Sequence, residues 1–175
     1  MNRIFTNIFI TSSGELIPGS FNDRLCLCDW RYREMRRVID GRIRQGLDAD
    51  YEDGTTEVIK ETIKQLKEYF ARERKGFTVP LAVDGTDFQK KVWYEIAKVK
   101  YGSTESCLGL AGNINKKPVR TVAAANGANA ISVFIPCSRI IGSDGELTGY
   151  AGGLNVKKNL LQLEADTGQM ELFDQ

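Results

Sequence analysis

The chain has 175 residues, of which 42% are hydrophobic and 27% charged, and its formal net charge is +1. This length allows one domain or two small ones with a real core, and the composition is ordinary for a globular protein. The near-zero charge gives no global sign of a nucleic-acid partner. No apolar stretch approaches membrane-spanning length, and the first residues alternate rather than run apolar, so we expect neither a membrane partner nor a signal peptide.

Cysteine and histidine usage limits the chemistry. Four cysteines without a targeting segment favour free thiols in a reducing interior, so we expect a cytoplasmic protein, or a nuclear one if the source is eukaryotic. The absence of histidine removes the commonest general base and metal ligand. Cys26 and Cys28 could begin a metal site, but no second pair or histidine completes one. We therefore expect packed thiols, no metal and no cofactor.

The first half of the chain begins with short apolar runs separated by turns. Residues 4–21 are typical of a hairpin with its bend near Ser13 and Gly14, and residues 25–30 of a further strand. These runs predict a small β-sheet at the N-terminus.

From Tyr51 the pattern changes, and residues 55–76 have the pattern of a helix. One face of this predicted helix carries Val58, Ile63, Leu66 and Phe70, charges fill the other side, and Gly76 follows near its end. Residues 77–83, with a proline in the middle, predict an extended linker. We therefore place a domain boundary there and expect domains over residues 1–83 and 84–175.

The second half is expected to be mainly helical. Asp84 or Thr86 could cap a helix over residues 88–99, which presents Phe88, Val92 and Ile96 on one face. Ser103 and Thr104 precede a short helix that runs to about Ala111, and residues 112–117 form a turn. Pro118 can open the next helix, because its missing N–H costs nothing at the first helical position.

These two helices and their turn match the helix-turn-helix pattern, which is weak evidence on its own. Lys116, Lys117 and Arg120 cluster at the start of the second helix. Three consecutive alanines follow, and such small side chains allow another molecule to approach the helix closely. Helix packing would explain the alanines equally well, but the basic cluster favours contact with DNA.

One cysteine has a distinctive setting. Residues 131–135 are β-branched and aromatic and predict a buried strand, which Pro136 must end. Cys137 would then lie at the end of that strand. The residues alone leave two alternatives open, a positioned thiol and a small buried core thiol.

A glycine-rich loop and a closing helix complete the chain. The loop has glycines at 142, 145, 149, 152 and 153, which indicates unusual backbone angles or close approach to a ligand, and it does not match a phosphate-binding loop. Residues 154–168 predict an amphipathic helix whose apolar side chains are Leu154, Leu160, Leu161 and Leu163. Glu164 lies beside this face, usually the place of a solvated carboxylate and less often of a buried partner for a cationic or protic group.

Three segments together resemble one family: DGTDFQKKVWYEI, AAANGANAISVFIPCSRIIG and TGYAGGLNVKKNLLQLE. Their order and spacing over residues 84–164 are similar to those of the O6-alkylguanine-DNA alkyltransferases, also called methylated-DNA–protein-cysteine methyltransferases. The Pro-Cys-x-Arg core followed by Gly-Tyr-x-Gly-Gly is highly specific. The phrase AANGAN resembles bacterial members more than animal ones.

The resemblance implies a monomeric suicide repair enzyme. It would bind double-stranded DNA, flip out an O6-alkylguanine and transfer the alkyl group irreversibly to its own cysteine, once. The implied fold is an α/β N-terminal domain, a small β-sheet plus helix of ribonuclease H-like type, followed by a mostly α, winged-helix-like DNA-binding domain.

The resemblance also assigns roles to residues. It makes Cys137 the nucleophile and alkyl acceptor, Glu164 the end of a hydrogen-bonded chain behind it, and Asn129 the brace of the preceding turn. Arg120 would fill the gap left by the flipped base. The remaining implied contacts to the base or to DNA come from Tyr150, Gly152, Gly153, Lys157, Lys116 and Lys117.

Two positions depart from the family pattern. Ser138 stands where the family has a histidine, and a hydroxyl is no general base at neutral pH. Cys107 stands in place of a tyrosine that helps rotate the nucleotide, unless it is simply a core residue. A non-catalytic binder of alkylated DNA is the alternative function, which the presence of Cys137 disfavours. A thiol hydrolase would need a base that the chain lacks.

Overall fold

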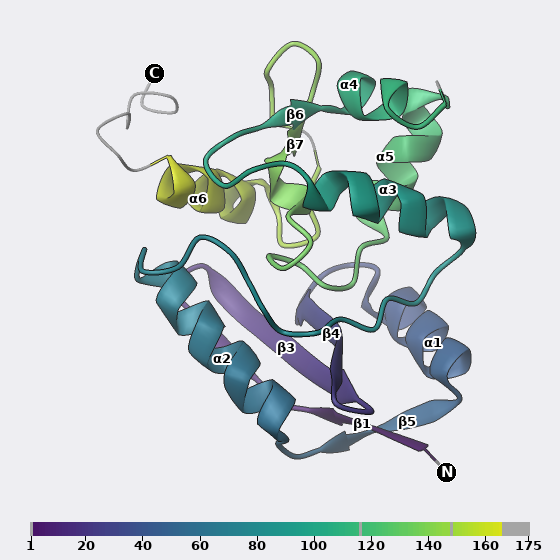
Figure 1. The fold of residues 1–175 in the computed structure, drawn as a ribbon, viewed down its shortest axis with the longest axis vertical. Helices are drawn as coiled ribbons and strands as arrows, with labels where there is room; N and C mark the ends of the chain where they lie inside the picture. Colours follow the sequence, from purple (N-terminus) through teal and green to yellow (C-terminus); the bar gives the residue numbers. More distant parts are fainter. Residues whose placement is uncertain (1, 116, 148, 166–175) are drawn as a thin grey trace. The chain divides into compact units, whose positions relative to one another are not determined.

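The structure is a computed structural model that describes residues 2–115, 117–147 and 149–165. The chain divides into two compact units, residues 1–86 and 87–175 (Figure 1). The sequence placed this division slightly earlier, after residue 83. Each unit is described by itself.

The N-terminal unit is built on a mixed five-stranded sheet. Its strands are β1 (Asn2–Thr6), β2 (Phe9–Thr11), β3 (Gly14–Phe21), β4 (Arg24–Trp30) and β5 (Ala49–Asp53). β4 pairs antiparallel with one edge of β3, while β1 and β2 share its other edge. β5 adds a parallel strand beside β1. The predicted hairpin and the predicted strand over residues 25–30 are thus confirmed.

A tight turn joins β3 to β4. Asn22 and Asp23 both have positive φ angles, 49° and 61°. Two consecutive left-handed residues, here of the types that tolerate this conformation, make a two-residue hairpin turn whose twist matches that of the strands. The turn sets the register in which Phe21 faces Arg24.

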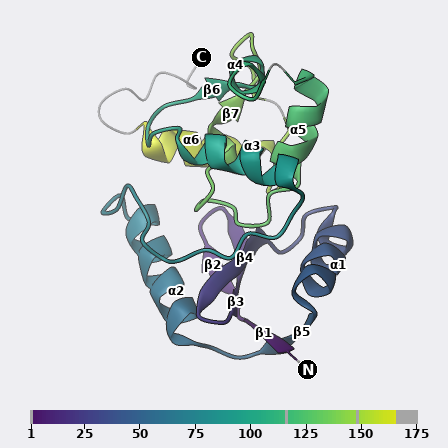
Figure 2. The same ribbon diagram turned by 45° about the vertical axis from the view of Figure 1, so that its right-hand side comes forward.

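Two helices accompany the sheet (Figures 1 and 2): α1 (Arg36–Leu47) and α2 (Glu57–Phe70). α2 packs against β3 and β4, whereas α1 packs against β5. Neither α1 nor β5 was predicted. α1 buries only Ile39 and Ile43, and its other positions are mostly charged or glycine, so the apolar pattern that marks a helix is almost absent.

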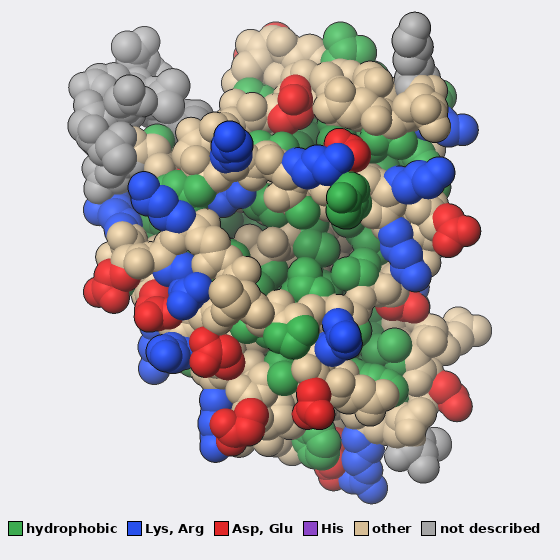
Figure 3. All heavy atoms as spheres, in the orientation of Figure 1, with side chains coloured by type: hydrophobic (Ala, Val, Ile, Leu, Met, Phe, Trp, Pro, Cys, Tyr) green, Lys and Arg blue, Asp and Glu red, His purple; other side chains and the backbone are tan. Residues whose placement is uncertain are grey.

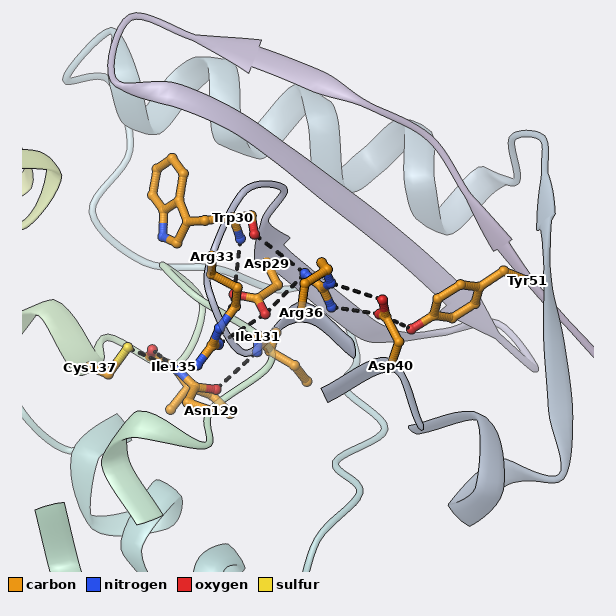
Figure 4. Close-up of polar contacts among 10 residues, drawn as sticks. All are labelled: Asp29, Trp30, Arg33, Arg36, Asp40, Tyr51, Asn129, Ile131, Ile135 and Cys137. Carbon is orange, nitrogen blue, oxygen red and sulfur yellow. Dashed lines mark hydrogen bonds and ion pairs between the residues drawn. The ribbon is translucent and has the colours of Figure 1, made fainter. Parts of the chain in front are cut away.

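Ion pairs at the start of α1 supply what its apolar face lacks (Figure 4). Asp29, at the end of β4, is fully buried and accepts hydrogen bonds from Arg33 at 3.0 Å and Arg36 at 3.1 Å. Arg36 also contacts Asp40, which accepts from the Tyr51 hydroxyl of β5 at 2.7 Å. Charge pairing between segments distant in sequence therefore connects β4, α1 and β5.

Charges on the surface of this unit are balanced as well. In the face drawn in Figure 3, acidic and basic side chains alternate over the N-terminal unit. Arg31 contacts Glu15 at 2.9 Å and Arg44 contacts Asp50 at 3.3 Å. Exposed pairs of this kind add little to stability, but they agree with the near-zero net charge.

The buried face of α2 differs from the predicted one. It carries Ile59, Thr62, Gln65, Leu66 and Tyr69, while Val58, Ile63 and Phe70 are only half-buried. The polar members are satisfied within the unit: the Thr62 hydroxyl donates to the Val58 carbonyl, and the Gln65 amide bonds Thr78. The prediction was confirmed for Leu66 and wrong for the other three positions, because it allowed only apolar residues on the core face.

Residues 77–83 are extended, as predicted, but they are not a free linker. The Leu25 N–H donates to the Pro80 carbonyl at 2.9 Å, and the Ala82 N–H donates to the Leu25 carbonyl at 2.9 Å. These bonds attach the segment to β4 beyond the edge of the regular sheet.

The C-terminal unit is mostly helical. Its elements are α3 (Asp87–Ala97), β6 (Glu105–Ser106), α4 (Cys107–Gly112), α5 (Val119–Gly127), the 3-10 helix η1 (Cys137–Arg139), β7 (Ile140–Ile141) and α6 (Leu154–Glu164). α3 and α4 both pack on α5, and the indole of Trp93 donates to the Ala125 carbonyl at 2.8 Å. Among the described residues, no helix combines the length and the apolar composition that a membrane span requires.

The predicted helix-turn-helix is present as α4 and α5, with shifted ends. Ser106 caps α4 by accepting from the Gly109 N–H at 2.8 Å, so the helix starts after Ser103 and Thr104, the residues expected to precede it. The chain first forms β6, which pairs in parallel with β7. Pro118 is the N-cap of α5 rather than its first helical residue.

Removal of the cap of α2 tests the local assignment. The Thr56 hydroxyl accepts from the Ile59 N–H at 3.2 Å and contacts Ser20 at 2.8 Å. Thr56→Ala should lower the free energy of unfolding by about 1 kcal/mol in urea denaturation. Thr55→Ala, at the exposed neighbouring position, is the matched control and should change it by less than about 0.5 kcal/mol. Equal effects would contradict the cap.

Candidate functional site

Residues 131–135 form a buried turn, not the predicted strand. The Ile135 N–H donates to the Ile131 carbonyl at 2.9 Å, and Val133 has a φ angle of 74°. A β-branched residue in the left-handed region is unusual and reverses the chain. The prediction was wrong because β-branched residues report burial as much as strand. Cys137 follows Pro136 and begins η1.

Asn129 braces this turn from inside (Figure 4). Its side chain is almost completely buried, and its Oδ1 accepts from the Ile131 N–H at 2.9 Å. Its Nδ2 donates to the Ile135 carbonyl at 2.9 Å and to the Cys137 Sγ at 3.2 Å. One amide therefore fixes the turn and positions the thiol that follows it.

Lys157 brings a positive charge toward the same thiol. It is fully buried on α6, and its Nζ donates to the Ile140 carbonyl. Burial lowers the pKa of Lys157, while its electrostatic interactions with Cys137 and Cys107 oppose that shift. Because the attraction is mutual, the ammonium group favours the thiolate form of Cys137.

Arg139 and Glu164 form a buried ion pair. Arg139 Nε donates to Glu164 Oε1 at 2.8 Å and its Nη2 donates to Oε2 at 3.1 Å. The Arg139 Nη1 also donates to the Val99 carbonyl at 2.6 Å, and the Gly102 N–H donates to Glu164 Oε1 at 3.3 Å. The pair thereby ties η1 and α6 to the chain that follows α3. Glu164 is therefore a buried partner of a cation and not a solvated carboxylate, which the sequence made the commoner expectation.

Ser138 lies between Cys137 and Arg139 in the sequence. It is buried, with 2% of its surface exposed. The family pattern would place a histidine here, in a chain that leads from the cysteine to the glutamate. In this protein both carboxylate oxygens of Glu164 accept from Arg139. The positive charge of Arg139 is therefore compensated by Glu164, and Lys157 is the cation coupled to the thiol.

Cys107, the other departure from the family pattern, is half-buried at the first position of α4. Burial raises the pKa of its thiol, and the electrostatic influence of Lys157 lowers it in part. The same lysine is coupled to Cys137. The charge of Lys157 therefore acts on both thiols, and the role of Cys107 stays a prediction.

The glycine-rich loop leads into α6 and sets the position of Lys157. The Gly153 N–H donates to the Tyr150 carbonyl at 2.9 Å, and Gly153 has a φ angle of 96° at the N-cap of α6. The Lys157 N–H closes the first turn on the Gly153 carbonyl at 3.0 Å. Tyr150 and Gly152 are partly exposed beside it. A left-handed N-cap of this kind requires glycine.

The basic residues predicted to contact DNA lie at the start of α5. Lys117 and Arg120 are exposed, as are Ala123 and Ala124 further along the helix. Val122 and Ala125 face the core. α5 thus presents a basic end followed by a small, smooth surface. Lys116 lies outside the described residues.

The remaining cysteines differ from Cys137 in their surroundings. Burial raises the pKa of Cys26 to about 12 and also raises that of Cys28, so both remain protonated thiols in the core. Among the described residues, no group of three or more histidine, cysteine and acidic side chains could hold a metal ion. The absence of a metal and of a cofactor remains a prediction.

Sequence reasoning missed the partner of Glu164. It treated Arg139 as a source of positive field for the thiol, whereas the structure pairs it with Glu164. The signal was available, because a glutamate beside the apolar face of a helix needs a cation once it is buried.

Comparison with known proteins agrees with this geometry. Residues 87–166 match the family described as 6-O-methylguanine DNA methyltransferase, DNA binding domain. The methylated-DNA–protein-cysteine methyltransferase of Methanosarcina acetivorans is 48% identical over 109 residues, 62% of this chain and 70% of that protein. That of Mycobacterium bovis is 44% identical over 115 residues, 64% of this chain and 70% of that protein.

Solved structures extend the likeness to both units. The Mycobacterium tuberculosis OGT crystallised in complex with DNA superposes with a TM-score of 0.77 at 32% identity, covering 93% of this chain and 92% of that one. The O6-methylguanine methyltransferase of the same organism gives 0.75 at 33% identity, covering 94% and 93%.

A DNA-binding helical unit that carries a braced, buried cysteine defines the class of cysteine-dependent DNA repair transferases. Within that class, the chain belongs to the methylated-DNA–protein-cysteine methyltransferases, which act in the repair of O6-methylguanine in DNA.

The buried ion pair can be tested by a double-mutant cycle. Glu164→Gln should leave the Arg139 guanidinium buried without its counter-ion and lower the free energy of unfolding by about 3 kcal/mol or more in urea denaturation. The double variant Arg139→Met, Glu164→Met should lose less free energy of unfolding than Arg139→Met or Glu164→Met alone. In the double variant no buried charge is left without its partner.

The exposed pair of Glu95 and Lys98, on and just after α3, provides the control. Glu95→Gln should leave the unfolding transition unchanged. Additive losses at Arg139 and Glu164 would contradict the coupling.

Proposed function

We propose that this protein repairs O6-alkylguanine in double-stranded DNA by moving the alkyl group irreversibly to Cys137, one group per protein molecule. The observation that carries the proposal is the thiol of Cys137, held by the Asn129 amide at 3.2 Å and coupled to the buried ammonium of Lys157. A sulfur that is fixed in place and whose thiolate form a cation stabilises is a prepared nucleophile.

The transfer is a displacement at the alkyl carbon. The Cys137 thiolate forms the new sulfur–carbon bond while the bond between that carbon and O6 breaks. The electron pair of the broken bond remains with the purine, which takes up a proton and leaves as ordinary guanine. That proton balances the one lost by the thiol, and the product thioether has no route back to a thiol. The enzyme is therefore consumed in a single turnover.

Electrostatics replace the missing histidine in this proposal. Ser138 can donate or accept a hydrogen bond but cannot act as a base at neutral pH. Lys157 favours the thiolate before reaction, when the charge is on sulfur. The ion pair of Arg139 and Glu164 holds η1 and α6 in place while charge moves from sulfur to the purine. Glu164 is in this view a positioning residue and not the proton sink of the reaction.

DNA would be bound through the helix-turn-helix. The exposed Lys117 and Arg120 at the start of α5 are suited to phosphate contacts, with Lys116 preceding them in sequence. The exposed alanines of α5 permit close approach to a groove. We assign Arg120 to the gap that the flipped nucleotide leaves in the stack, where it offsets part of the unstacking cost.

The flipped base would lie against the loop before α6. Tyr150 offers an aromatic wall, and the backbone near Gly152 and Gly153 can approach the base closely because no side chain intervenes. Cys107, near Lys157, would line the same pocket in place of the tyrosine of the family. A thiol is smaller than a phenol, so this exchange leaves more room for the alkyl group.

We assign the N-terminal unit to the ribonuclease H-like type and the helix-turn-helix to a winged-helix-like domain, with domains over residues 1–83 and 84–175. We further propose that the protein acts as a monomer, without cofactor, in the cytoplasm.

Mapping of the alkylated residue tests the function. After incubation with duplex DNA containing O6-methylguanine, mass spectrometry should show one added methyl group per protein, and peptide mapping should place it on Cys137. Cys137→Ala should bind the DNA and take up no methyl group. A Cys107→Ser variant, which keeps Cys137, is the control and should still react. Methyl groups on Cys26, Cys28 or Cys107 would refute the assignment, and binding without any transfer would support the non-catalytic alternative.

The charge of Lys157 predicts a pH profile. With free O6-benzylguanine as substrate, the single-turnover rate should rise with pH as Cys137 ionises. It should fall again as Lys157 loses its proton, at a pH below the ordinary value for lysine because burial lowers the pKa. Lys157→Met should react roughly tenfold more slowly at neutral pH and lose the falling limb.

The adjacent lysine is the matched control for this experiment. Lys158→Met removes the same charge from the next position of α6 and should keep the wild-type profile. A falling limb that persists in Lys157→Met would assign it to another group.

A further inference from the structure

A groove on the surface of the C-terminal unit lies between α3 and the turn that joins α4 to α5. On the α3 side it is lined by Lys90, Lys91 and Tyr94. On the other side it is lined by Asn113, which is the C-cap of α4, and by Asn115. Its described lining contains no residue of η1 or of the loop before α6. The groove is therefore distinct from the site proposed for alkyl transfer.

The side chains of the groove are of the types that bind phosphate. Lys90 and Lys91 are exposed, and neither forms an ion pair with any described residue. Lysine, tyrosine and asparagine all supply hydrogen-bond donors, and side chains of these types contact the DNA backbone in protein–DNA complexes. In Figure 3, Lys and Arg side chains gather over the position that α3 has in Figure 1. Exposed lysines usually form a solvated face, so the charge alone does not identify a partner.

An aromatic ring accompanies these lysines. Tyr94 is 67% exposed on the outer side of α3. The Lys98 ammonium lies over the ring of Tyr94, 4.6 Å from its centroid, and donates to Glu95 at 2.8 Å. Among the described lining residues Glu95 is the only acid, and Lys98 compensates its charge. The open surface therefore keeps the positive charge of Lys90 and Lys91, beside a ring that offers apolar contact to a sugar and a hydroxyl to a phosphate.

The groove is continuous with the surface proposed to bind DNA. Ile114 lines the groove, and its carbonyl accepts from the Lys117 N–H at 3.3 Å, so the wall of the groove leads into the start of α5. α3 also packs on both α4 and α5. In helix-turn-helix proteins the first helix crosses the DNA backbone while the second enters a groove of the duplex. A backbone that passes the turn between α4 and α5 therefore also meets the groove beside α3.

We propose that this groove is a second contact for the DNA backbone, in which Lys90 and Lys91 bind phosphate groups next to the helix-turn-helix. The inference rests on the proposed function, because it takes duplex DNA as the partner. Contacts to phosphate carry no sequence information but fix the position and orientation of the duplex. The groove thus binds undamaged and alkylated DNA alike, and it holds the duplex in place during alkyl transfer to Cys137.

Binding of undamaged duplex DNA, measured over a series of salt concentrations, tests the proposal. The groove variant, Lys90→Gln combined with Lys91→Gln, should bind roughly tenfold more weakly at about 0.1 M salt, because two phosphate contacts and their counterion release are lost. The slope of log K against log salt should become less steep by about 2. Glu95→Gln, which removes the acid of the groove, should bind about threefold more tightly.

Two exposed lysines of α2 provide the matched control. Lys64→Gln combined with Lys67→Gln removes the same charge from the N-terminal unit and should keep the wild-type affinity and salt dependence. Equal weakening in both double variants, or a groove variant that binds like wild type, would overturn the inference. Weaker binding by Glu95→Gln would also count against it.

A separate measurement distinguishes this inference from the proposed function. The groove variant keeps Cys137, so at a saturating concentration of duplex DNA that contains O6-methylguanine it should still take up one methyl group per protein. Wild-type protein that takes up no methyl group under these conditions would overturn the proposed function, whatever the binding experiment shows. Full methyl uptake together with unchanged DNA affinity in the groove variant would overturn only the second contact.

Discussion

The rest of the site depends on three hydrogen bonds made by the Asn129 side chain. The turn over residues 131–135 belongs to no helix or sheet, so its buried backbone groups have no regular partners. Asn129 provides them, and the amide nitrogen that binds the Ile135 carbonyl also reaches the Cys137 sulfur. Thiol position and turn conformation are therefore one constraint. An apolar side chain of equal size would leave buried N–H and C=O groups unsatisfied. It would also remove the hydrogen bond that holds the Cys137 sulfur.

Around this constraint, two buried cations serve different purposes. Arg139 faces a carboxylate in a two-bond pair, so its charge is compensated and its contribution is to join η1, α6 and the chain after α3. Lys157 donates to a neutral carbonyl, and its charge interacts with the thiols of Cys137 and Cys107. A chain without histidine has no imidazole to remove the cysteine proton. A desolvated positive charge that acts on the sulfur has a related effect, because it stabilises the thiolate form.

The N-terminal unit shows where sequence patterns lose their value. Its hairpins could be predicted, because alternating side chains and turn residues are local signals. α1 could not, since Asp29 holds Arg33 and Arg36 through ion pairs and the helix has little apolar pattern. The helix face of α2 was misplaced for a related reason: its core positions include threonine and glutamine, whose polar groups are satisfied by neighbours that only the fold brings near.

By itself, the sequence determined that the protein has a sheet-bearing first unit and a helical second one, and that Cys137 belongs to a Pro-Cys-x-Arg core with a glycine loop behind it. Those conclusions rest on local periodicity and on a rare combination of residues. Both can be recognised in the sequence without knowledge of the fold. Only the tertiary structure decided that residues 131–135 turn rather than extend, that Glu164 pairs with Arg139, and that the charge of Lys157 acts on the thiols of Cys137 and Cys107. Each of these depends on burial and on partners distant in the chain, and desolvation gives a charge or an amide its role only after the core has closed around it.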